Sequence, residues 1–179
     1  MKYSQKLRMK LPENSDYVDQ NVFNENFTKL DTYVTDLTQI CTLSNADVMT
    51  ITEPPQRINF ESIIKNGGVF ALSAGGAKVM ESGFVIAHAH IAFEGLWDGD
   101  AVVTDVQLNG QNRWAATLVK ASGWWETIDQ TTPLIAVQKN DLISLSVYHG
   151  SEFQDPHIRR GTLKVPASFM NVYFYKNVN

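Results

Sequence analysis

The sequence predicts an all-β antiparallel sandwich that follows an N-terminal α-helical stalk. Between residues 23 and 41 the apolar positions alternate four and three residues apart, and from about residue 67 onward the apolar period falls to two. Many short strand-like segments without an intervening helical period indicate an antiparallel sandwich and disfavour an α/β enzyme. We therefore expect one head domain with an N-terminal appendage in this chain of 179 residues.

Composition narrows the classes of partner. The chain is 44% hydrophobic and 19% charged, with a net charge of -4, and no Lys/Arg run offers a stripe for phosphates. We expect no nucleic-acid partner. We also expect no secretory signal, because the basic opening MKYSQKLRMKLPENSD has no apolar h-region. We expect no membrane insertion, because no run of about 18 apolar residues occurs. A single cysteine, Cys41, excludes an intrachain disulfide and fits assembly in a reducing compartment.

Residues 1–20 are expected to form an arm. They show no sustained period, and Pro12, Asn14, Ser15 and Asp16 are turn formers. A segment this short has too small a core to fold alone, so we expect it to dock onto another protein.

Residues 21–43 are expected to form an amphipathic helix, with Asp19 or Asn21 as its cap. A lone helix gains little from a stripe with coiled-coil spacing, so we expect a stalk that gathers several copies of the head. An amphipathic helix packed on its own domain is the alternative. The trimerisation residues on this stripe would be Phe23, Phe27, Leu30, Val34, Leu37 and Cys41.

Residues 44–66 are expected to form an extended linker. The run Glu53-Pro54-Pro55-Gln56 forbids continued helix and favours extended backbone. Ile51 and Ile58 hint at packing against neighbouring elements, so the expected linker has limited flexibility.

Residues 67–179 are expected to form the head, and their clearest strand runs from Ser82 to Phe93. Alternation places Phe84, Ile86, His88, His90 and Ala92 on one face. The opposite face is wholly apolar and is the expected core side. Similar patterns predict further strands at 101–108, 113–120, 132–137, 141–148, 161–165 and 168–175.

Four head segments carry a resemblance: SGFVIAHAHIAF, VVTDVQLNGQNRWAATLV, PLIAVQKNDLISLSV and ASFMNVYFYKN. In this order they resemble the C1q and TNF-like jelly roll, over roughly residues 67 to 177. The shared features include an Asn-Gly hairpin at Asn109-Gly110 and an acidic turn at Asn140-Asp141. The family usually has Gly-Asp at this turn, but Asn tolerates the left-handed conformation that Gly supplies. The resemblance implies a jelly-roll head that forms compact trimers.

The N-terminal part resembles a different group. KLPENSDYVDQNVFNENFTKLDTYV, residues 10–34, is similar to the start of many tail-fibre and baseplate-associated proteins from phages and prophages of Gram-positive bacteria. This resemblance implies attachment to a phage tail or baseplate, assembly in the bacterial cytoplasm and a final location in the virion tail.

Aromatic side chains in predicted turns suggest a saccharide-binding surface. A sugar offers one apolar C–H face and a rim of hydroxyls, which suit an exposed aromatic ring beside short polar groups. For the adjacent tryptophans we favour another interpretation, in which one is buried and the other seals a subunit interface. The candidate ligand-binding residues are Trp97, Asp98, Asp100, Trp124, Trp125, His149 and Arg159.

His88 and His90 share a strand face, as a metal-binding pair would require. No third ligand at a telling spacing accompanies them, so we expect packed or interface histidines and no metal. No cofactor is expected either.

Residues 149–160 contain histidines, carboxylates and arginines, but sequence proximity provides neither a nucleophile nor a catalytic separation. We find no Gly-rich phosphate loop, nucleophile elbow or zinc-protease motif. The expected product is therefore not an enzyme.

These observations favour a homotrimeric phage or prophage tail-fibre or receptor-binding protein that attaches to a bacterial surface glycan. One alternative is a purely structural tail or baseplate appendage. Another is a host-encoded C1q-like lectin or signalling ligand. Exposed aromatics ringed by polar groups would favour binding, whereas burial of every tryptophan would favour the structural alternative.

Overall fold

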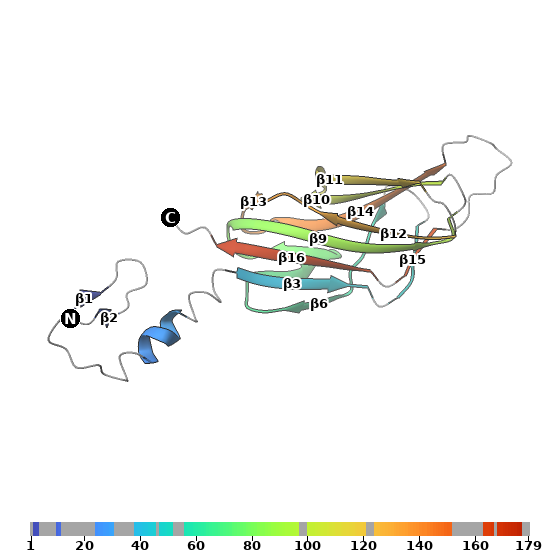
Figure 1. Cartoon of the computed structure of the whole chain (residues 1–179). Helices are drawn as coiled ribbons and strands as arrows, with labels where there is room; N and C mark the ends of the chain where they lie inside the picture. The colour runs from blue at the N-terminus through green and yellow to red at the C-terminus, as the bar shows by residue number, and fades with distance from the viewer. Residues whose placement is uncertain are drawn as a thin grey trace.

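Two antiparallel sheets pack face to face and enclose the hydrophobic core (Figure 1). The computed structural model describes residues 2–3, 10–11, 24–30, 38–45, 47–51, 56–96, 100–120, 124–151, 163–166 and 168–176. Within this part of the chain, no helix is long and apolar enough to cross a membrane. Ahead of the head lie a helix at 24–30 and a two-stranded pair, β1 (Lys2–Tyr3) and β2 (Lys10–Leu11).

The first sheet has the strand order β4-β15-β9-β16-β3-β6, and β12 and β13 also pair with β9. The bounds of these strands are β3 Thr38–Ser44, β4 Met49–Ile51, β6 Ser62–Lys65, β9 Gly83–Glu94, β12 Trp125–Thr131, β13 Ile135–Val137, β15 Leu163–Val165 and β16 Phe169–Lys176.

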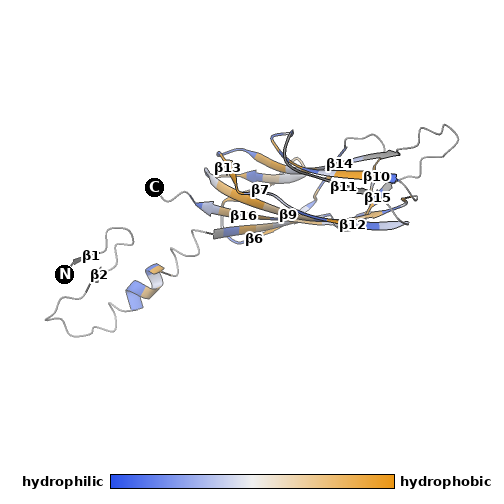
Figure 2. Ribbon diagram, turned by 45° about the horizontal axis from the view of Figure 1, so that its top comes forward, coloured by the Kyte–Doolittle hydropathy of each residue, from blue (hydrophilic) through white to orange (hydrophobic). Residues whose placement is uncertain are grey.

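The second sheet has the order β11-β10-β14-β8-β7, and β5 pairs with β14. Its strands are β5 Gln56–Arg57, β7 Phe70–Ser73, β8 Gly76–Val79, β10 Asp100–Leu108, β11 Gln111–Lys120 and β14 Leu142–Ser151. Figure 2 shows the hydrophobic stretches that the long strands of the head contribute. The expectation of an all-β antiparallel head is confirmed.

Strand β9 confirms the predicted alternation. Each residue of its inward face is fully buried, while the residues between them are partly exposed except for Ala92. The inward residues are Val85, Ala87, Ala89, Ile91 and Phe93. The other predicted strands also form, although β13 begins at Ile135, three residues after the predicted start at Thr132.

Two tight turns confirm their expected backbone. Asn109 and Gly110 have φ values of 55° and 75° in the hairpin between β10 and β11, which is the left-handed geometry of a type I′ turn. Asn140 has a φ of 76° before β14. The Asn109 side chain joins the two turns, because its Nδ2 donates to Asp141 at 2.8 Å and its Oδ1 accepts from the Leu142 N–H at 2.8 Å.

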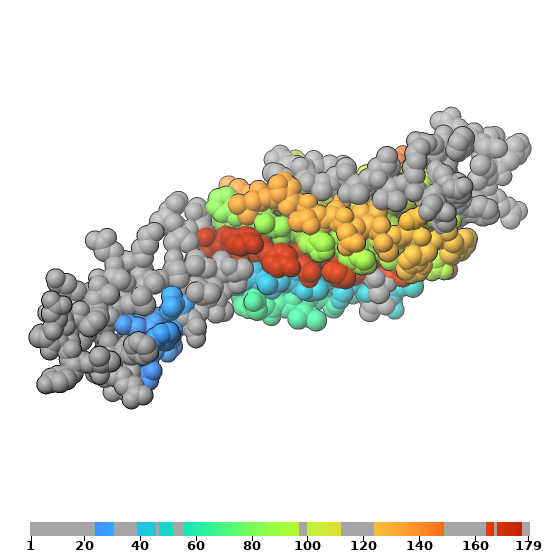
Figure 3. All heavy atoms as spheres, viewed as in Figure 1, coloured from blue at the N-terminus to red at the C-terminus, as the bar shows by residue number. Residues whose placement is uncertain are grey.

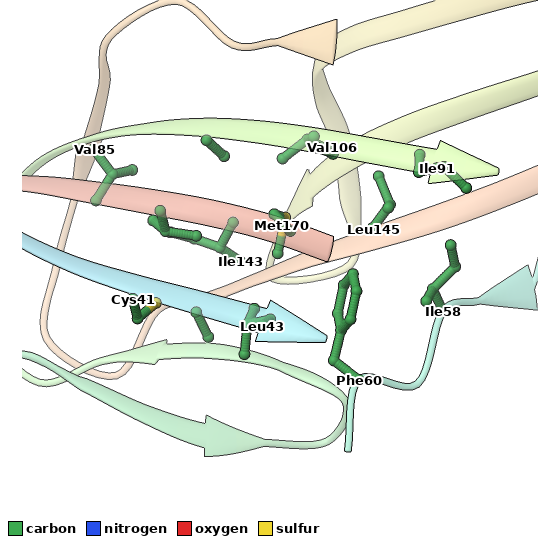
Figure 4. Close-up of a cluster of buried hydrophobic side chains, with 14 of the residues drawn as sticks. Cys41, Leu43, Ile58, Phe60, Val85, Ile91, Val106, Ile143, Leu145 and Met170 are labelled. Carbon is green, nitrogen blue, oxygen red and sulfur yellow. The ribbon is translucent and has the colours of Figure 1, made fainter. Parts of the chain in front are cut away.

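The predicted helix over 21–43 is wrong in its C-terminal part. Residues 38–44 form β3, which pairs with β16 and β6. Cys41 and Leu43 are fully buried, and Figure 4 shows them in the core beside Met170 of β16. Cys41 therefore packs inside the head and is not a coiled-coil residue. Burial raises the pKa of its thiol to about 12.

The reason for this error is a double pattern. Cys41 stands four residues after Leu37, as in a helix, and two residues before Leu43, as in a strand. Pairing with two neighbouring strands selects the strand pattern, because it places Cys41 and Leu43 in the core. Among the other predicted stalk residues, Phe27 and Leu30 lie on the helix at 24–30 and are 53% and 38% exposed. Phe23, Val34 and Leu37 lie outside the described residues, as do 31–37 in general.

The predicted linker over 44–66 is also wrong, because much of it belongs to the head. It contributes β4, β5 and β6, and Ile58 and Phe60 fill the core with exposures of 0% and 1% (Figure 4). The Ile58 N–H donates to the Leu145 carbonyl at 2.8 Å. The head therefore begins at β3 and not at residue 67. Strands of two to four residues are too short to show a period in the sequence.

Candidate functional site

The first sheet presents an outer face that is not covered by any segment the structure describes (Figure 3). Strands β6, β3, β16, β9 and β12 lie side by side across it. We call it the open face. Its residues on the three central strands are Ile40, Thr42 and Ser44 of β3, Phe169, Asn171, Tyr173 and Tyr175 of β16, and Phe84, Ile86, His88 and His90 of β9.

The half of the open face where β9 begins is apolar. Tyr173 of β16 lies between Ile86 of β9 and Ile40 of β3, and each of the three is half-buried. The next row pairs Tyr175, which is 37% exposed, with Phe84. Aromatic and branched side chains in directly opposed positions form continuous apolar surface. Contiguous apolar surface on an outer face is a feature that interaction sites share.

The middle of the open face carries a polar row that is internally satisfied. Asn171 of β16 lies opposite both His88 and Thr42. Thr42 Oγ1 donates to Asn171 Oδ1 at 2.7 Å, and His88 Nδ1 lies 2.9 Å from Thr131 Oγ1. Side chains held by such bonds form a surface of fixed shape.

Beside this row lies a cluster centred on His90. Its Nδ1 is 2.8 Å from Asp129 Oδ1, and its ring stacks on Phe169 with centroids 5.2 Å apart and 19° between the planes. The Nε2 of His88 lies 3.9 Å from the same Asp129 oxygen. The two histidines thus share one face, as expected, and pack against aromatic and hydroxyl neighbours. Within the described residues, no group of three or more His, Cys, Asp or Glu side chains could hold a metal ion.

The tryptophan pair lies at the end of β9 that is far from the apolar half. Trp125 lies opposite Glu94, and the Trp124 carbonyl accepts from the Gly95 N–H at 3.0 Å. Trp124 is 60% exposed and Trp125 is 52% exposed. The expectation that one of them is buried is therefore wrong for the single chain. Alternation places Trp125 on the same face as Asp129, at the border of the open face.

Backbone pairing brings several strand ends to this same end of the head, which we call the tip. Asp100 begins β10 opposite Ser151, the last residue of β14. Asp100, a candidate ligand-binding residue, is only 7% exposed in the single chain. His149 lies in β14 opposite Val102. Trp97, Asp98 and Arg159 lie outside the described residues.

The chain reaches the head at the opposite end. Thr38, where β3 begins, pairs with Tyr175, which in turn pairs with Phe84 near the start of β9. Trp125 pairs with Glu94, the last residue of β9. Since β9 has 12 residues, these two ends are separated by roughly 35 Å of strand. Figure 1 shows β9 running along the whole length of the head.

Sequence reasoning missed the open face, although a signal was present. Phe84 and Ile86 are apolar on the face of β9 that was expected to point outward, and Tyr173 and Tyr175 repeat this on β16. A strand that is apolar on both faces is usually covered on both. That signal predicts an additional partner surface.

Comparisons with known proteins agree with this architecture. The murine APRIL structure at pH 8.5 is similar with a TM-score of 0.53 and 11% identity, over 76% of this chain and 98% of that chain. The globular domain of zebrafish complement 1qA has a TM-score of 0.53 and 9% identity, over 78% and 98%. The PRD1 vertex protein P5 has a TM-score of 0.50 and 12% identity, over 79% and 99%.

These likenesses show a TNF/C1q-like fold, and the expected jelly-roll class of the head is confirmed at that level. No protein-family model matches the chain. No curated protein matches it either.

Proposed function

We propose that the chain is a homotrimeric, non-enzymatic attachment protein of a phage or prophage tail. The open face joins three heads, the tip contacts a glycan of the bacterial surface, and the N-terminal segment holds the trimer to the tail or baseplate. The observation that carries this proposal is the separation of an apolar face from an aromatic tip along one strand, β9.

The open face supports assembly from copies of the chain. Its aromatic rows fill the half where β9 begins, and hydrogen-bonded polar pairs lie beside them along the sheet. Apolar area beside polar groups that are already hydrogen-bonded is typical of a subunit interface. The TNF/C1q-like fold supports three copies, because the resemblance noted in the sequence implies compact trimers.

The tip supports attachment. Trp124 and Trp125 offer aromatic surface where several strand ends meet. This is the end of β9 that lies far from Thr38, where β3 begins. Three tips on one axis would raise the avidity of a weak glycan site by roughly 10²- to 10⁴-fold if the receptors are suitably spaced. A location in the virion is supported by the N-terminal resemblance and by the fold shared with a phage vertex protein.

The direct test combines mass and adsorption. Light scattering of the full chain is expected to give the mass of three chains, and Trp124→Ala is expected to keep this mass while attachment to host cells falls. Truncation of an aromatic anchor at a binding site typically costs about 2 kcal/mol or more, and each trimer repeats the loss. A persistent monomer, or full attachment by the trimeric variant, would contradict the proposal.

A structural appendage without receptor binding is the second candidate, and the position of Trp125 favours it. This side chain lies on the same face as Asp129, where a neighbouring copy could cover it. Trp125→Ala separates the candidates. If Trp125 seals the interface, the variant dissociates more readily; if it contacts the glycan, the variant stays trimeric and attaches poorly.

A further inference from the structure

We propose that Asp129, His88 and His90 form a proton-binding site that couples the assembly of the open face to pH. This inference rests on the proposed trimer. The three side chains lie on the open face within two neighbouring strands, β9 and β12. One carboxylate oxygen, Asp129 Oδ1, lies 2.8 Å from His90 Nδ1 and 3.9 Å from His88 Nε2.

The geometry defines where protons can be held. An ionised carboxylate only accepts hydrogen bonds, so His90 Nδ1–H is the donor to Asp129. The Nε2 of His90 then remains available for a second proton. His88 is fixed by Thr131 at 2.9 Å. When both imidazoles are neutral the cluster carries one negative charge, and one added proton makes it neutral.

Burial changes which of these states is favoured. In the single chain the Asp129 side chain is 59% exposed and the two imidazoles are 34% and 32% exposed, so water solvates the charge. A subunit that covers the open face removes this water, and an unpaired buried charge is costly. An imidazolium beside the carboxylate forms a neutral pair with a charge-assisted hydrogen bond. Closing the face therefore favours uptake of one proton per subunit.

Among the residues that the structure describes, the other charged groups of this sheet lie away from the cluster. On β9 the next charged side chain is Glu94, which lies opposite Lys164 of β15. On β16 the nearest charge is Lys176, which pairs with Glu81 at 3.7 Å near the other end of the strand. On β12, Glu126 alternates to the inward side. The central rows of β16 and β3 contribute the hydroxyl of Tyr173 and the neutral groups of Asn171, Thr42 and Ser44.

The sign of the effect follows from linkage. Histidine is the side chain whose charge ordinarily changes between pH 5 and 8. Because the assembled state binds more protons than the separated chains, assembly tightens as the pH falls from 8 to 6. Each proton taken up on assembly lowers the dissociation constant by up to about tenfold per pH unit. A trimer contains three clusters. We expect the dissociation constant of the trimer to fall by about tenfold over this range.

The test uses the full chain and a matched pair of variants. Sedimentation of labelled protein over a dilution series at pH 8, 7 and 6 gives the dissociation constant, and exchange of subunits between labelled trimers gives the dissociation rate where the trimer is too tight to dilute. Asp129→Asn keeps the acceptor oxygen for His90 but removes the negative charge. In this variant protonation leaves an unpaired positive charge, so acidification should weaken the trimer.

Glu94→Gln is the control, because it removes a carboxylate from the same strand outside the cluster. It should keep the slope of the unsubstituted chain. A trimer whose dissociation is independent of pH, or an Asp129→Asn variant with an unchanged slope, would overturn the inference while leaving the proposed trimer intact. A chain that stays monomeric at every pH would overturn both.

Discussion

The outer faces of the two sheets differ in the side chains that they present. The open face of the first sheet carries Phe84, Ile86, Tyr173 and Tyr175 in adjacent rows. The corresponding face of the second sheet carries Val103 and Asp105 of β10 beside Ser146 and Tyr148 of β14. On this second face partial burial raises the pKa of Asp105, and Tyr148 is 49% exposed. The first sheet is therefore partly apolar on both faces, whereas the outer face of the second sheet mixes apolar side chains with a carboxylate and a hydroxyl.

A charge in the apolar half of the open face is expected to have the largest effect on the difference between the two outer faces. Tyr173→Glu is expected to reduce the mass in light scattering from three chains to one, because burial of an ion without a partner costs several kcal/mol per copy. Tyr148→Glu is the matched variant on the second sheet and should stay trimeric. Equal effects of the two changes would show that the two outer faces are equivalent.

The two faces of β16 give the next comparison. Phe174 is fully buried, and its ring makes an edge contact with Phe70, with the ring centroids 6.2 Å apart. Its neighbour Tyr175 is 37% exposed. Phe174→Ala should lower the free energy of unfolding by about 3 to 5 kcal/mol. Tyr175→Ala should change unfolding less and assembly more. Denaturant titration at several protein concentrations separates these effects, and a small effect of Phe174→Ala would place β16 outside the core.

Cys41 tests whether β3 belongs to the head. The raised pKa keeps its thiol protonated, so alkylation by iodoacetamide at pH 8 should require unfolding. The folded state holds the proton more tightly than the ordinary thiol with pKa 9.0, so this contribution to stability is present below pH 9 and is lost as the pH rises toward 12. The extent of labelling is measured by mass spectrometry. Rapid labelling of the folded chain would show that Cys41 is exposed, as in the predicted stalk, and not buried in the head.

The smallest effect is expected from a chelator. His88 and His90 are held by Thr131 and Asp129, so removal of metal ions should leave the melting temperature of the protein unchanged. A fall in melting temperature that zinc or nickel reverses would show that the histidine pair holds a metal on the open face.

The long strands could be predicted from the sequence, whereas the boundary between stalk and head could not. In β9 every inward residue is small or apolar, and a period of two persists over the whole strand. Cys41 fits both a helical and a strand period, and only pairing with β16 and β6 decides between them. β12 was missed because Glu126, Asp129 and Gln130 interrupt its apolar pattern. β12 is a strand despite this interrupted pattern, because it pairs with β9.

The candidate surfaces were predicted only in part. Tryptophans at a saccharide-binding surface were one interpretation of this segment, but the favoured one, with one tryptophan buried, is wrong for the single chain because Trp124 and Trp125 are both exposed. Asp100 has a turn-like sequence around it, but pairing with Ser151 places it at the start of a strand. The open face depends on which strands become neighbours: Tyr173 reaches Ile86 and Ile40 across the sheet, and both lie far from it in the chain. Sequence spacing contains no information on such contacts.

The antiparallel ladder along β9 has a mechanical consequence. A pull between Thr38 and the tip is directed along the strands, because β3 pairs with β16 over seven positions and β16 pairs with β9 over eight. Hydrogen bonds between strands are perpendicular to that direction. They are therefore loaded in shear and must yield together, whereas a perpendicular pull would open them one at a time. If the head holds a particle to a cell, as proposed, tension would pass along this ladder without separating its strands one bond at a time.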